Sequence, residues 1–316
     1  MNEKQPWTAS DMPDLHGRTA VVTGANAGLG LETARRLAER GAAVVFACRN
    51  PEKGAAAVAF VREQAPGAEL STVRLDLTVQ ESVRAAAAEL HDRVDRVDLL
   101  VNNAGTLTRT RSETVDGFET TIATNHLGPF AFTGLLLDLL TASPEGRVVT
   151  VSSGTAGYRS TTFDIDDLDY RRRPYKPMRV YGQSKLANLL FTLELQRRLN
   201  GTDARLLAVA ARPGVADSDF SQNFGPVRAF LSGAAPHWIS RLFMQSTEMG
   251  ALPTLRAATD PAVRGGEYFG PTGHAKGYPV LAEPVARAQD PEAAARLWEE
   301  SERLTGVRYR FGPGGA

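Results

Sequence analysis

The sequence is poor in cysteine and has no long apolar run, and each shortage excludes a class of protein. Cys48 is the single cysteine among 316 residues, so no intramolecular disulfide can form and thiolate-rich metal sites are excluded. The longest apolar stretch, Phe130 to Leu140, is too short for a membrane span and contains Asp138. The polar start, Met1 to Gly17, lacks the apolar segment of a signal peptide. We therefore expect a cytoplasmic protein without a membrane span.

An excess of charge of either sign is also missing. Lys plus Arg and Asp plus Glu number 36 each, which argues against nucleic acid or an anionic membrane as a general partner. The five histidines are scattered without ligand spacing, so we predict no metal site. The expected partner is a small-molecule substrate. The sequence leaves the oligomeric state open, and a homodimer and a homotetramer are both compatible with it.

Short β-branched runs alternate with runs rich in Ala, Leu, Arg and Glu. The predicted strands cover residues 19–23, 44–47, 70–75, 98–101, 147–151, 206–210 and 268–269. The predicted helices cover residues 31–40, 51–64, 80–94, 117–140, 179–199, 247–258 and 291–304. Such alternation is typical of βαβ units. We predict an α/β fold: a Rossmann-type, doubly wound, seven-stranded parallel sheet of order 3-2-1-4-5-6-7 in a single domain.

Four peripheral segments are expected around this domain, which covers residues 1–316. Residues 1–16 form an N-terminal extension, 154–178 an extended loop, 216–246 a substrate lid, and 271–316 a Gly/Pro-rich C-terminal tail that ends in a helix.

A glycine-rich loop, TGANAGLG (23–30), joins the first predicted strand to the first helix. Glycines let the backbone turn tightly and approach a pyrophosphate, and the helix N-terminus offers free N–H groups. This indicates a dinucleotide site, with cofactor contacts expected from Gly24, Asn26, Gly28, Leu29 and Gly30. A glycine-rich turn without a ligand is the alternative.

The end of the second strand bears on the choice of dinucleotide. An acid commonly stands there, roughly 20 residues past the glycines, and binds the ribose 2′-OH of NAD. Here that position holds Cys48, followed by Arg49. A guanidinium suits a 2′-phosphate, so Arg49 favours NADP(H) over NAD(H). A plain surface arginine is the alternative.

Four further segments follow in order: NNAG (102–105) after the fourth strand, Asn125 in the next helix, Ser152-Ser153 ending the fifth strand, and YGQSK (181–185). Together with the glycine loop they resemble the short-chain dehydrogenase/reductase family over about residues 17–268. ACRN (47–50), NHLG (125–128) and SKLAN (184–188) most resemble its retinol-dehydrogenase-like branch and that branch's bacterial relatives. The resemblance implies NADP(H) chemistry. The membrane anchors of some members are expected to be absent.

Tyr181 and Lys185 stand four residues apart, which places both on one face of a helix. A carbonyl that accepts a hydride needs a proton donor at its oxygen, and an ammonium beside a phenol would lower the phenol's pKa. The resemblance makes Tyr181 the proton-transfer residue and lets Lys185 also bind the nicotinamide ribose. It assigns Ser153, the second serine of its pair, to the substrate oxygen. Asn125 would hold a water that links Lys185 to solvent.

Further cofactor contacts are implied by the resemblance alone. The adenine would meet residues after the third strand, and the nicotinamide would meet residues after the sixth. These contacts are expected from Asp76, Leu77, Asn103, Ala104, Gly105, Pro213, Gly214, Val215 and Ser218.

Two segments depart from the family's pattern. The 27 residues from Gly154 to Val180 form a longer connection than usual, which either shapes the pocket mouth with Tyr170, Arg171 to Arg173 and Tyr175 or is a solvated charged loop. The aromatic-rich stretch from Ala216 to Phe243 occupies the lid position and suits a hydrophobic substrate, unless its aromatics are plain core.

The predicted function is interconversion of a carbonyl and an alcohol on a hydrophobic small molecule, with Tyr181 as general acid/base. One alternative keeps the fold and the same Tyr and Lys for C=C reduction or epimerisation. A second alternative is a cofactor-binding regulatory protein without turnover.

Overall fold

Eight short strands form one sheet in the computed structural model, which describes residues 5–214, 245–273 and 275–311. The strands are β1 (Thr19–Thr23), β2 (Ala43–Cys48), β3 (Leu70–Arg74), β4 (Leu99–Asn102), β5 (Gly146–Val151), β6 (Leu206–Ala211), β7 (Tyr268–Pro271) and β8 (Pro279–Ala282). Their order is β3-β2-β1-β4-β5-β6-β7-β8, and all neighbours up to β7 pair in parallel. The predicted doubly wound α/β fold and its strand order are confirmed.

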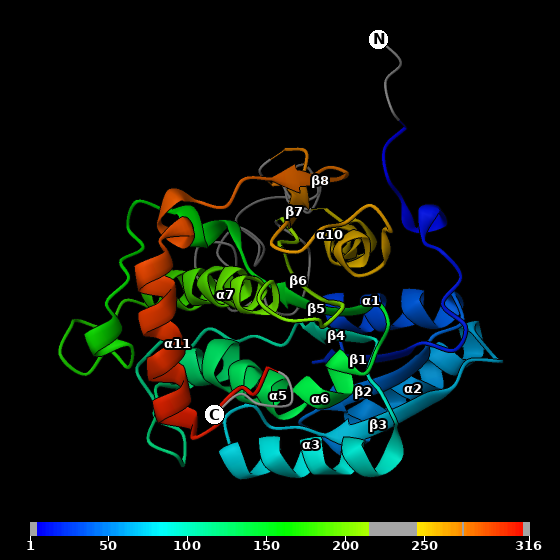
Figure 1. Cartoon of the computed structure of the whole chain (residues 1–316), viewed down its shortest axis with the longest axis horizontal. Helices are drawn as coiled ribbons and strands as arrows, with labels where there is room; N and C mark the ends of the chain where they lie inside the picture. The colour runs from blue at the N-terminus through cyan, green and yellow to red at the C-terminus, as the bar shows by residue number, and fades with distance from the viewer. Residues whose placement is uncertain (1–4, 215–244, 274, 312–316) are drawn as a thin grey trace, which may run out of the picture.

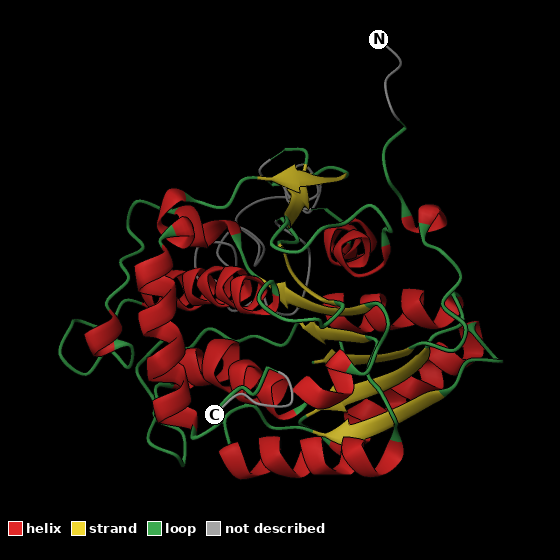
Figure 2. Ribbon diagram, viewed as in Figure 1, coloured by secondary structure: helices red, strands yellow, loops and turns green. Residues whose placement is uncertain are grey.

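Helices cover both faces of the sheet, as Figure 2 shows. One face carries α1 (Gly28–Glu39), α2 (Pro51–Gln64) and α10 (Thr247–Thr259). The other face carries α3 (Gln80–Arg93), α5 (Gly128–Leu135), α6 (Leu137–Thr141) and α7 (Pro177–Leu199). Because both faces are covered, the central strands are buried on each side, which explains their continuous apolar sequences.

The C-terminal helix α11 (Pro291–Thr305) packs outside this second layer against α7 and α5 (Figure 1). Trp298 is 2% exposed and packs on Phe130 and Phe191, with ring centroids 5.1 and 5.8 Å away. Tyr309 adds a ring 4.4 Å from Trp298 and donates a hydrogen bond to the Phe130 carbonyl at 2.6 Å. The predicted tail thus contributes an aromatic cluster to the core.

The prediction of seven strands was one strand short. After β7 the chain turns through Gly277, at φ +131°, and returns as β8, antiparallel to β7. The Thr272 N–H donates to the Tyr278 carbonyl at 2.8 Å and closes this turn. Pro279 can begin β8 because an edge strand tolerates a residue without an N–H donor.

The prediction of one helix over residues 117–140 was also wrong in detail. Gly117 lies in a turn at φ +80°, and the helical backbone starts with α4 (Thr120–Ile122). A π-helical segment, η2 (Ala123–Leu127), follows and leads into α5. Leu136 then departs from helical dihedrals and separates α5 from α6. The π-turn matters for the site, since it presents Asn125 and His126 to α7.

Short 3₁₀ helices complete the described elements: η1 (Ala9–Asp11), η3 (Gly154–Gly157), η4 (Ile165–Asp167) and η7 (Ala286–Gln289). Within the residues that the structure describes, no helix is both long and apolar enough to cross a bilayer.

Candidate active site

One large cavity of about 1250 Å³ opens at the carboxyl ends of β1, β4, β5 and β6. This is where ligands bind in open α/β sheets. The cavity wall brings together most of the residues predicted for the site, from every part of the chain: Gly24, Asn26, Gly28, Leu29, Gly30, Arg49, Asp76, Leu77, Asn103, Ala104, Gly105, Ser153, Tyr181, Lys185, Pro213 and Gly214. Asn125 lies behind this wall. Val215, Ser218 and nearly all of the predicted lid lie outside the described residues.

The glycine loop needs its glycines for two different reasons. Gly24 and Gly28 have φ of +66° and +53°, a region that side chains rarely adopt. Gly30 is a close-approach position, because a Cβ there would lie 2.4 Å from the Gly24 carbonyl oxygen and 2.5 Å from Asn103 Nδ2. The first turn of α1 therefore packs directly onto the loop and on the end of β4.

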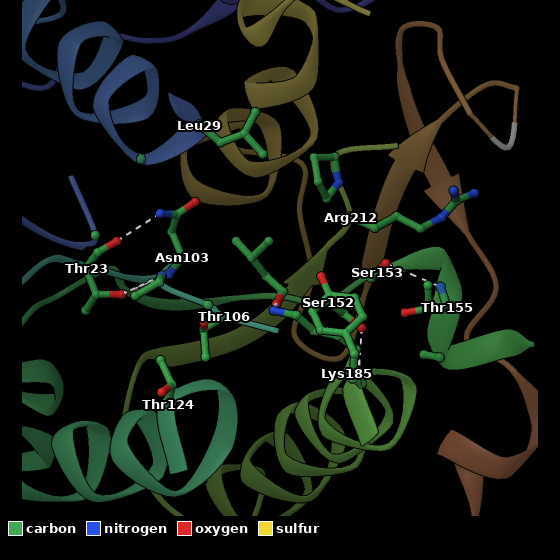
Figure 3. Close-up of a pocket in the computed structure, with 18 of the residues that line it drawn as sticks. Thr23, Leu29, Asn103, Thr106, Thr124, Ser152, Ser153, Thr155, Lys185 and Arg212 are labelled. Atoms are coloured by element: carbon green, nitrogen blue, oxygen red, sulfur yellow. Dashed lines mark hydrogen bonds between the residues drawn. The ribbon is translucent and has the colours of Figure 1, made fainter. Parts of the chain in front are cut away.

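Polar contacts hold this arrangement together (Figure 3). Thr23 Oγ1 accepts hydrogen bonds from the Asn103 and Ala104 N–H groups, both at 3.0 Å. Asn103 Nδ2 donates to the Thr23 carbonyl at 2.9 Å. At the N-terminus of α1, Ala27 offers no side-chain cap and the first turn carries no acid. Within the part of the chain that the structure describes, the free N–H groups and the positive helix end therefore face the cavity with no capping side chain and no acid of the first turn to satisfy them.

The neighbouring rim contains Arg49 and Asp76, at the ends of β2 and β3. Arg49 is exposed and lines the cavity beside the glycine loop. Cys48 points into the interior, and burial raises the pKa of its thiol to about 11. Asp76 Oδ1 accepts hydrogen bonds from the Thr78 N–H (3.0 Å) and hydroxyl (2.6 Å) and so shapes the turn after β3. The Asp76 carboxylate is thus engaged by its own loop, and among the described residues no hydrogen bond or ion pair is recorded for the Arg49 guanidinium.

Helix α7 brings Tyr181 against Ser153 at the end of β5. The Tyr181 side chain is buried, and its hydroxyl lies near the Ser153 side chain. Burial raises the pKa of the phenol, and the nearby Ser153 hydroxyl opposes that rise. The expected lowering by Lys185 does not appear. The ammonium lies 5.7 Å from the ring centroid, and desolvation outweighs the attraction.

The two serines at the end of β5 point to different partners. Ser152 Oγ donates to the Lys185 backbone carbonyl at 2.7 Å and so holds α7 to β5. Ser153 Oγ lies near the Tyr181 hydroxyl and accepts a hydrogen bond from the Thr155 N–H at 3.3 Å. The geometry agrees with the choice of Ser153 as the substrate-facing hydroxyl, which stays a prediction.

Lys185 is buried, and its Nζ donates to the Val151 carbonyl at 2.8 Å. Burial lowers the pKa of the ammonium to about 8. Asn125 lies close by in η2. Its Oδ1 accepts the Thr106 N–H at 2.7 Å, and its Nδ2 donates to Ser184 Oγ at 2.9 Å. A Cβ on Gly105 would lie 3.4 Å from both Asn125 Oδ1 and Lys185 Nζ, so this glycine leaves the space between them open.

The extended loop contributes to the cavity wall, but not through the residues that were predicted for the pocket mouth. Tyr170, Arg171 to Arg173 and Tyr175 are absent from the described cavity wall. The reason is local: Asp167 is 5% exposed and accepts hydrogen bonds from the backbone N–H groups of residues 171–173. The Arg173 Nε adds an ion pair with Asp167 at 3.0 Å. The basic run therefore folds onto the loop's own acidic cluster.

The cavity wall next to Ser153 comes instead from Gly154 to Tyr158 and from Met178. A distant segment fixes this wall. Arg287 of η7 donates to the carbonyls of Tyr158, at 3.0 Å, and Thr161, and a Cβ on Gly157 would lie 2.9 Å from Val285. Other wall residues not foreseen from the sequence are Thr106, Thr124, Arg212, Tyr268, Glu283 and Val285. Arg212 could have been predicted from the sequence, because it directly precedes Pro213 and Gly214, which were predicted to contact the cofactor.

Comparison with known proteins agrees with this geometry. The family description "short chain dehydrogenase" matches residues 18–164. Human retinol dehydrogenase 13 is 39% identical over 297 residues, which cover 93% of this chain and 86% of the relative. Mouse polyprenol dehydrogenase is 38% identical over 302 residues, with 94% and 86% covered.

Solved structures show the same likeness. A Mycobacterium paratuberculosis protein described as putative and uncharacterized superposes with a TM-score of 0.79 at 40% identity, covering 97% of this chain and 100% of that one. RhlG of Pseudomonas aeruginosa, solved as a complex with NADP, gives a TM-score of 0.63 at 25% identity, covering 81% and 95%. The chain belongs to the short-chain dehydrogenase/reductase family of oxidoreductases that bind a nicotinamide cofactor, in its retinol-dehydrogenase-like branch.

Proposed function

We propose that this protein is an NADP(H)-dependent oxidoreductase that interconverts a carbonyl and an alcohol on a hydrophobic small molecule. The observation that carries the proposal is the convergence of three groups at one point of the cavity. The Tyr181 hydroxyl lies near Ser153, and Lys185 follows one helical turn later with its ammonium 5.7 Å from the centroid of the tyrosine ring. All three line the same cavity as the glycine loop.

The residues present fit a dinucleotide. The uncapped start of α1 and the positive-φ glycines form a cradle for a pyrophosphate, which a Cβ at Gly30 would close. Arg49 would pair with a 2′-phosphate, Lys185 would bind the nicotinamide ribose, and Pro213 and Gly214 would border the nicotinamide. When bound, NADPH supplies the hydride. That RhlG was solved with NADP supports the choice of cofactor.

Side chains of the protein then carry out the proton transfer. Because burial raises its pKa, the Tyr181 phenol keeps its proton at neutral pH and can donate it to the substrate oxygen. Ser153 would donate a hydrogen bond to the same oxygen and orient it. The Lys185 ammonium would stabilise the tyrosinate that remains. In the reverse direction Tyr181 must first lose its proton, so alcohol oxidation is expected to need a higher pH than reduction.

The substrate half of the cavity supports an apolar substrate. Tyr158 and Met178 line it and are 53% and 37% exposed, so a substrate can contact their apolar surface. Val285 and Tyr268 add further apolar surface. Two relatives are named for retinol and polyprenol, both of which are long apolar alcohols.

The proposal is tested by following NADPH consumption with a panel of long-chain and aromatic aldehydes and ketones, with product analysis by mass spectrometry. An alcohol product is expected. A saturated C=C bond or an epimer would replace the proposed reaction by another reaction of the same fold. Tight NADPH binding without turnover of any compound would favour a regulatory role.

Arg49→Ala is expected to weaken NADPH binding about 10- to 100-fold while changing NADH binding by less than about twofold. The reason is that a guanidinium–phosphate contact is a charge-assisted hydrogen bond, and only NADPH carries the 2′-phosphate. Dissociation constants for both dinucleotides, measured by fluorescence titration, check this. Arg62→Ala, on the exposed side of α2, serves as control. Equal losses for both cofactors would show that Arg49 does not read the phosphate.

The reduction rate is expected to fall as pH rises above about 8. Burial lowers the Lys185 pKa to about 8, so the ammonium that stabilises tyrosinate is present below that pH and lost above it. The pH profile of kcat/KM reports ionisations of the free enzyme and checks the expectation. Lys185→Arg keeps its charge throughout, so its residual activity should lack this descending limb. A wild-type rate that climbs between neutrality and pH 9 would contradict the assignment.

A further inference from the structure

Helix α7 carries a third polar side chain in line with Tyr181 and Lys185. Asn188 lies one turn beyond Lys185 and is 3% exposed. Its Nδ2 donates to the Val151 carbonyl at 3.2 Å, the same oxygen that accepts Lys185 Nζ at 2.8 Å. A carbonyl oxygen has two lone pairs, so these two donors satisfy it completely. The backbone carbonyl at the end of β5 thus accepts hydrogen bonds from both an ammonium and an amide.

The π-turn also packs beside Asn188. Asn125 Nδ2 of η2 donates to Ser184 Oγ at 2.9 Å, and the ring of the next residue, His126, lies near Asn188, with its Nδ1 lacking a hydrogen-bond partner among the described residues. His126 is 1% exposed and is fixed in turn by Ser301 Oγ of α11, 2.9 Å from its Nε2. Burial lowers the pKa of His126 to about 4, so its ring is neutral here. The hydrogen bond to the Val151 carbonyl therefore fixes the Asn188 amide, and the neutral ring of His126 lies beside it.

A neutral hydrogen-bond acceptor holds the Lys185 ammonium. In the part of the chain that the structure describes, no carboxylate forms an ion pair with its ammonium. Tyr181 on the same helix lies 5.7 Å away, measured to its ring centroid, and neither Tyr181 nor the buried His126 of η2 is an anion at neutral pH. The ammonium is therefore held by a neutral carbonyl oxygen, an anchor that it can exchange for cofactor hydroxyls.

We propose that Asn188 is a positioning residue for Lys185: it fixes the Val151 carbonyl as the resting acceptor of the ammonium and keeps that carbonyl hydrogen-bonded when the ammonium turns toward the cofactor. Without the amide, departure of Lys185 would leave a buried carbonyl unpaired, which is costly. The lysine would then be retained at β5. This inference rests on the proposed function, because it gives Lys185 a cofactor to turn to.

Two substitutions with side chains similar in size to asparagine test whether the amide donor of Asn188 positions Lys185. Asn188→Leu removes the amide donor, and Asn188→Asp replaces it with an acceptor that attracts the ammonium. Thr192→Val is the matched control: Thr192 is equally buried one turn further along α7, and its hydroxyl bonds only the Asn188 backbone carbonyl, at 2.8 Å. Three quantities are measured for each protein: the Lys185 pKa by NMR titration of isotope-labelled lysine, the NADPH dissociation constant, and kcat and KM for a carbonyl substrate.

Asn188→Asp is expected to raise the Lys185 pKa by about one unit or more and to weaken NADPH binding about tenfold, since the carboxylate retains the ammonium. Asn188→Leu is expected to lower kcat about tenfold with a nearly unchanged substrate KM, since the lysine is released less readily. Thr192→Val should match the wild type in all three measurements.

The proposal is overturned if Asn188→Asp leaves the lysine titration unshifted, or if Asn188→Leu resembles Thr192→Val in both cofactor affinity and kcat. Failure of the proposed function looks different. In that case the wild type itself would reduce no carbonyl compound, and the lysine titration and NADPH affinity of the variants would still decide whether Asn188 positions Lys185.

Discussion

Tyr181→Phe is expected to lower kcat for carbonyl reduction by about 10³-fold while NADPH affinity stays within about threefold of the wild type. The substitution removes only the phenolic oxygen, so the packing of a side chain that is 6% exposed is kept. Proton transfer by a positioned side chain is worth about 10²- to 10⁴-fold, and no other acidic proton is placed against Ser153 by the described residues. Single-turnover kinetics together with a cofactor titration measure both effects.

Tyr170→Phe is the matched control. It makes the same chemical change at a tyrosine that is 3% exposed, in the extended loop and away from the cavity wall. Its turnover is expected to equal that of the wild type. If Tyr181→Phe kept more than about a tenth of the wild-type rate, the proton-donor assignment would be wrong.

Gly30→Ala is expected to weaken NADPH binding by about 100-fold or more and to lower the free energy of unfolding by about 1–3 kcal/mol. The added Cβ would lie 2.4 Å from the Gly24 carbonyl oxygen and 2.5 Å from Asn103 Nδ2. Because one neighbour is backbone, the loop itself must move. That movement would displace the N–H groups that form the cradle at the start of α1. Cofactor titration and thermal denaturation with and without NADPH measure the two losses.

Gly54→Ala provides the comparison. Gly54 also lies in a helix and is buried, but a Cβ there would meet its nearest neighbours at 3.5 Å, an ordinary contact. This variant should bind NADPH normally and be equally or slightly more stable, because a helix favours alanine over glycine. A Gly30→Ala protein that behaved like Gly54→Ala would show that the loop tolerates a side chain at this position.

Features built from local spacing were predictable from the sequence. Tyr181 and Lys185 share a helix face because they stand four residues apart, and the glycine loop follows a strand and opens a helix. The strand order followed from the alternation of strands and helices. For the helix face and the glycine loop the determining contacts lie within a few residues. The strand order instead joins distant strands, such as β1 and β4, and was predictable because connections in alternating α/β folds follow regular rules.

Features that depend on distant partners were not predictable. The wall beside Ser153 is held by Arg287, more than a hundred residues later, and nothing near Tyr158 signals that clamp. The π-turn at Asn125 breaks the helical period by a single residue, which a periodicity analysis cannot resolve. The run from Arg171 to Arg173 suggested a charged pocket mouth, whereas Asp167 of the same loop satisfies it. Strand β8 was not predicted, because the Gly and Pro residues around it are typical of loops.

The position of α11 has a consequence for the order in which the molecule is completed during synthesis. Phe191, on the helix that holds Tyr181 and Lys185, leaves the ribosome more than a hundred residues before Trp298, the side chain that covers it. Until then the apolar flank of that helix faces water and is open to premature association. His126 gains its Ser301 partner only at this late stage. In a nascent chain the residues of the dinucleotide site can therefore fold together early. The helix with Tyr181 and Lys185 reaches its final packing last.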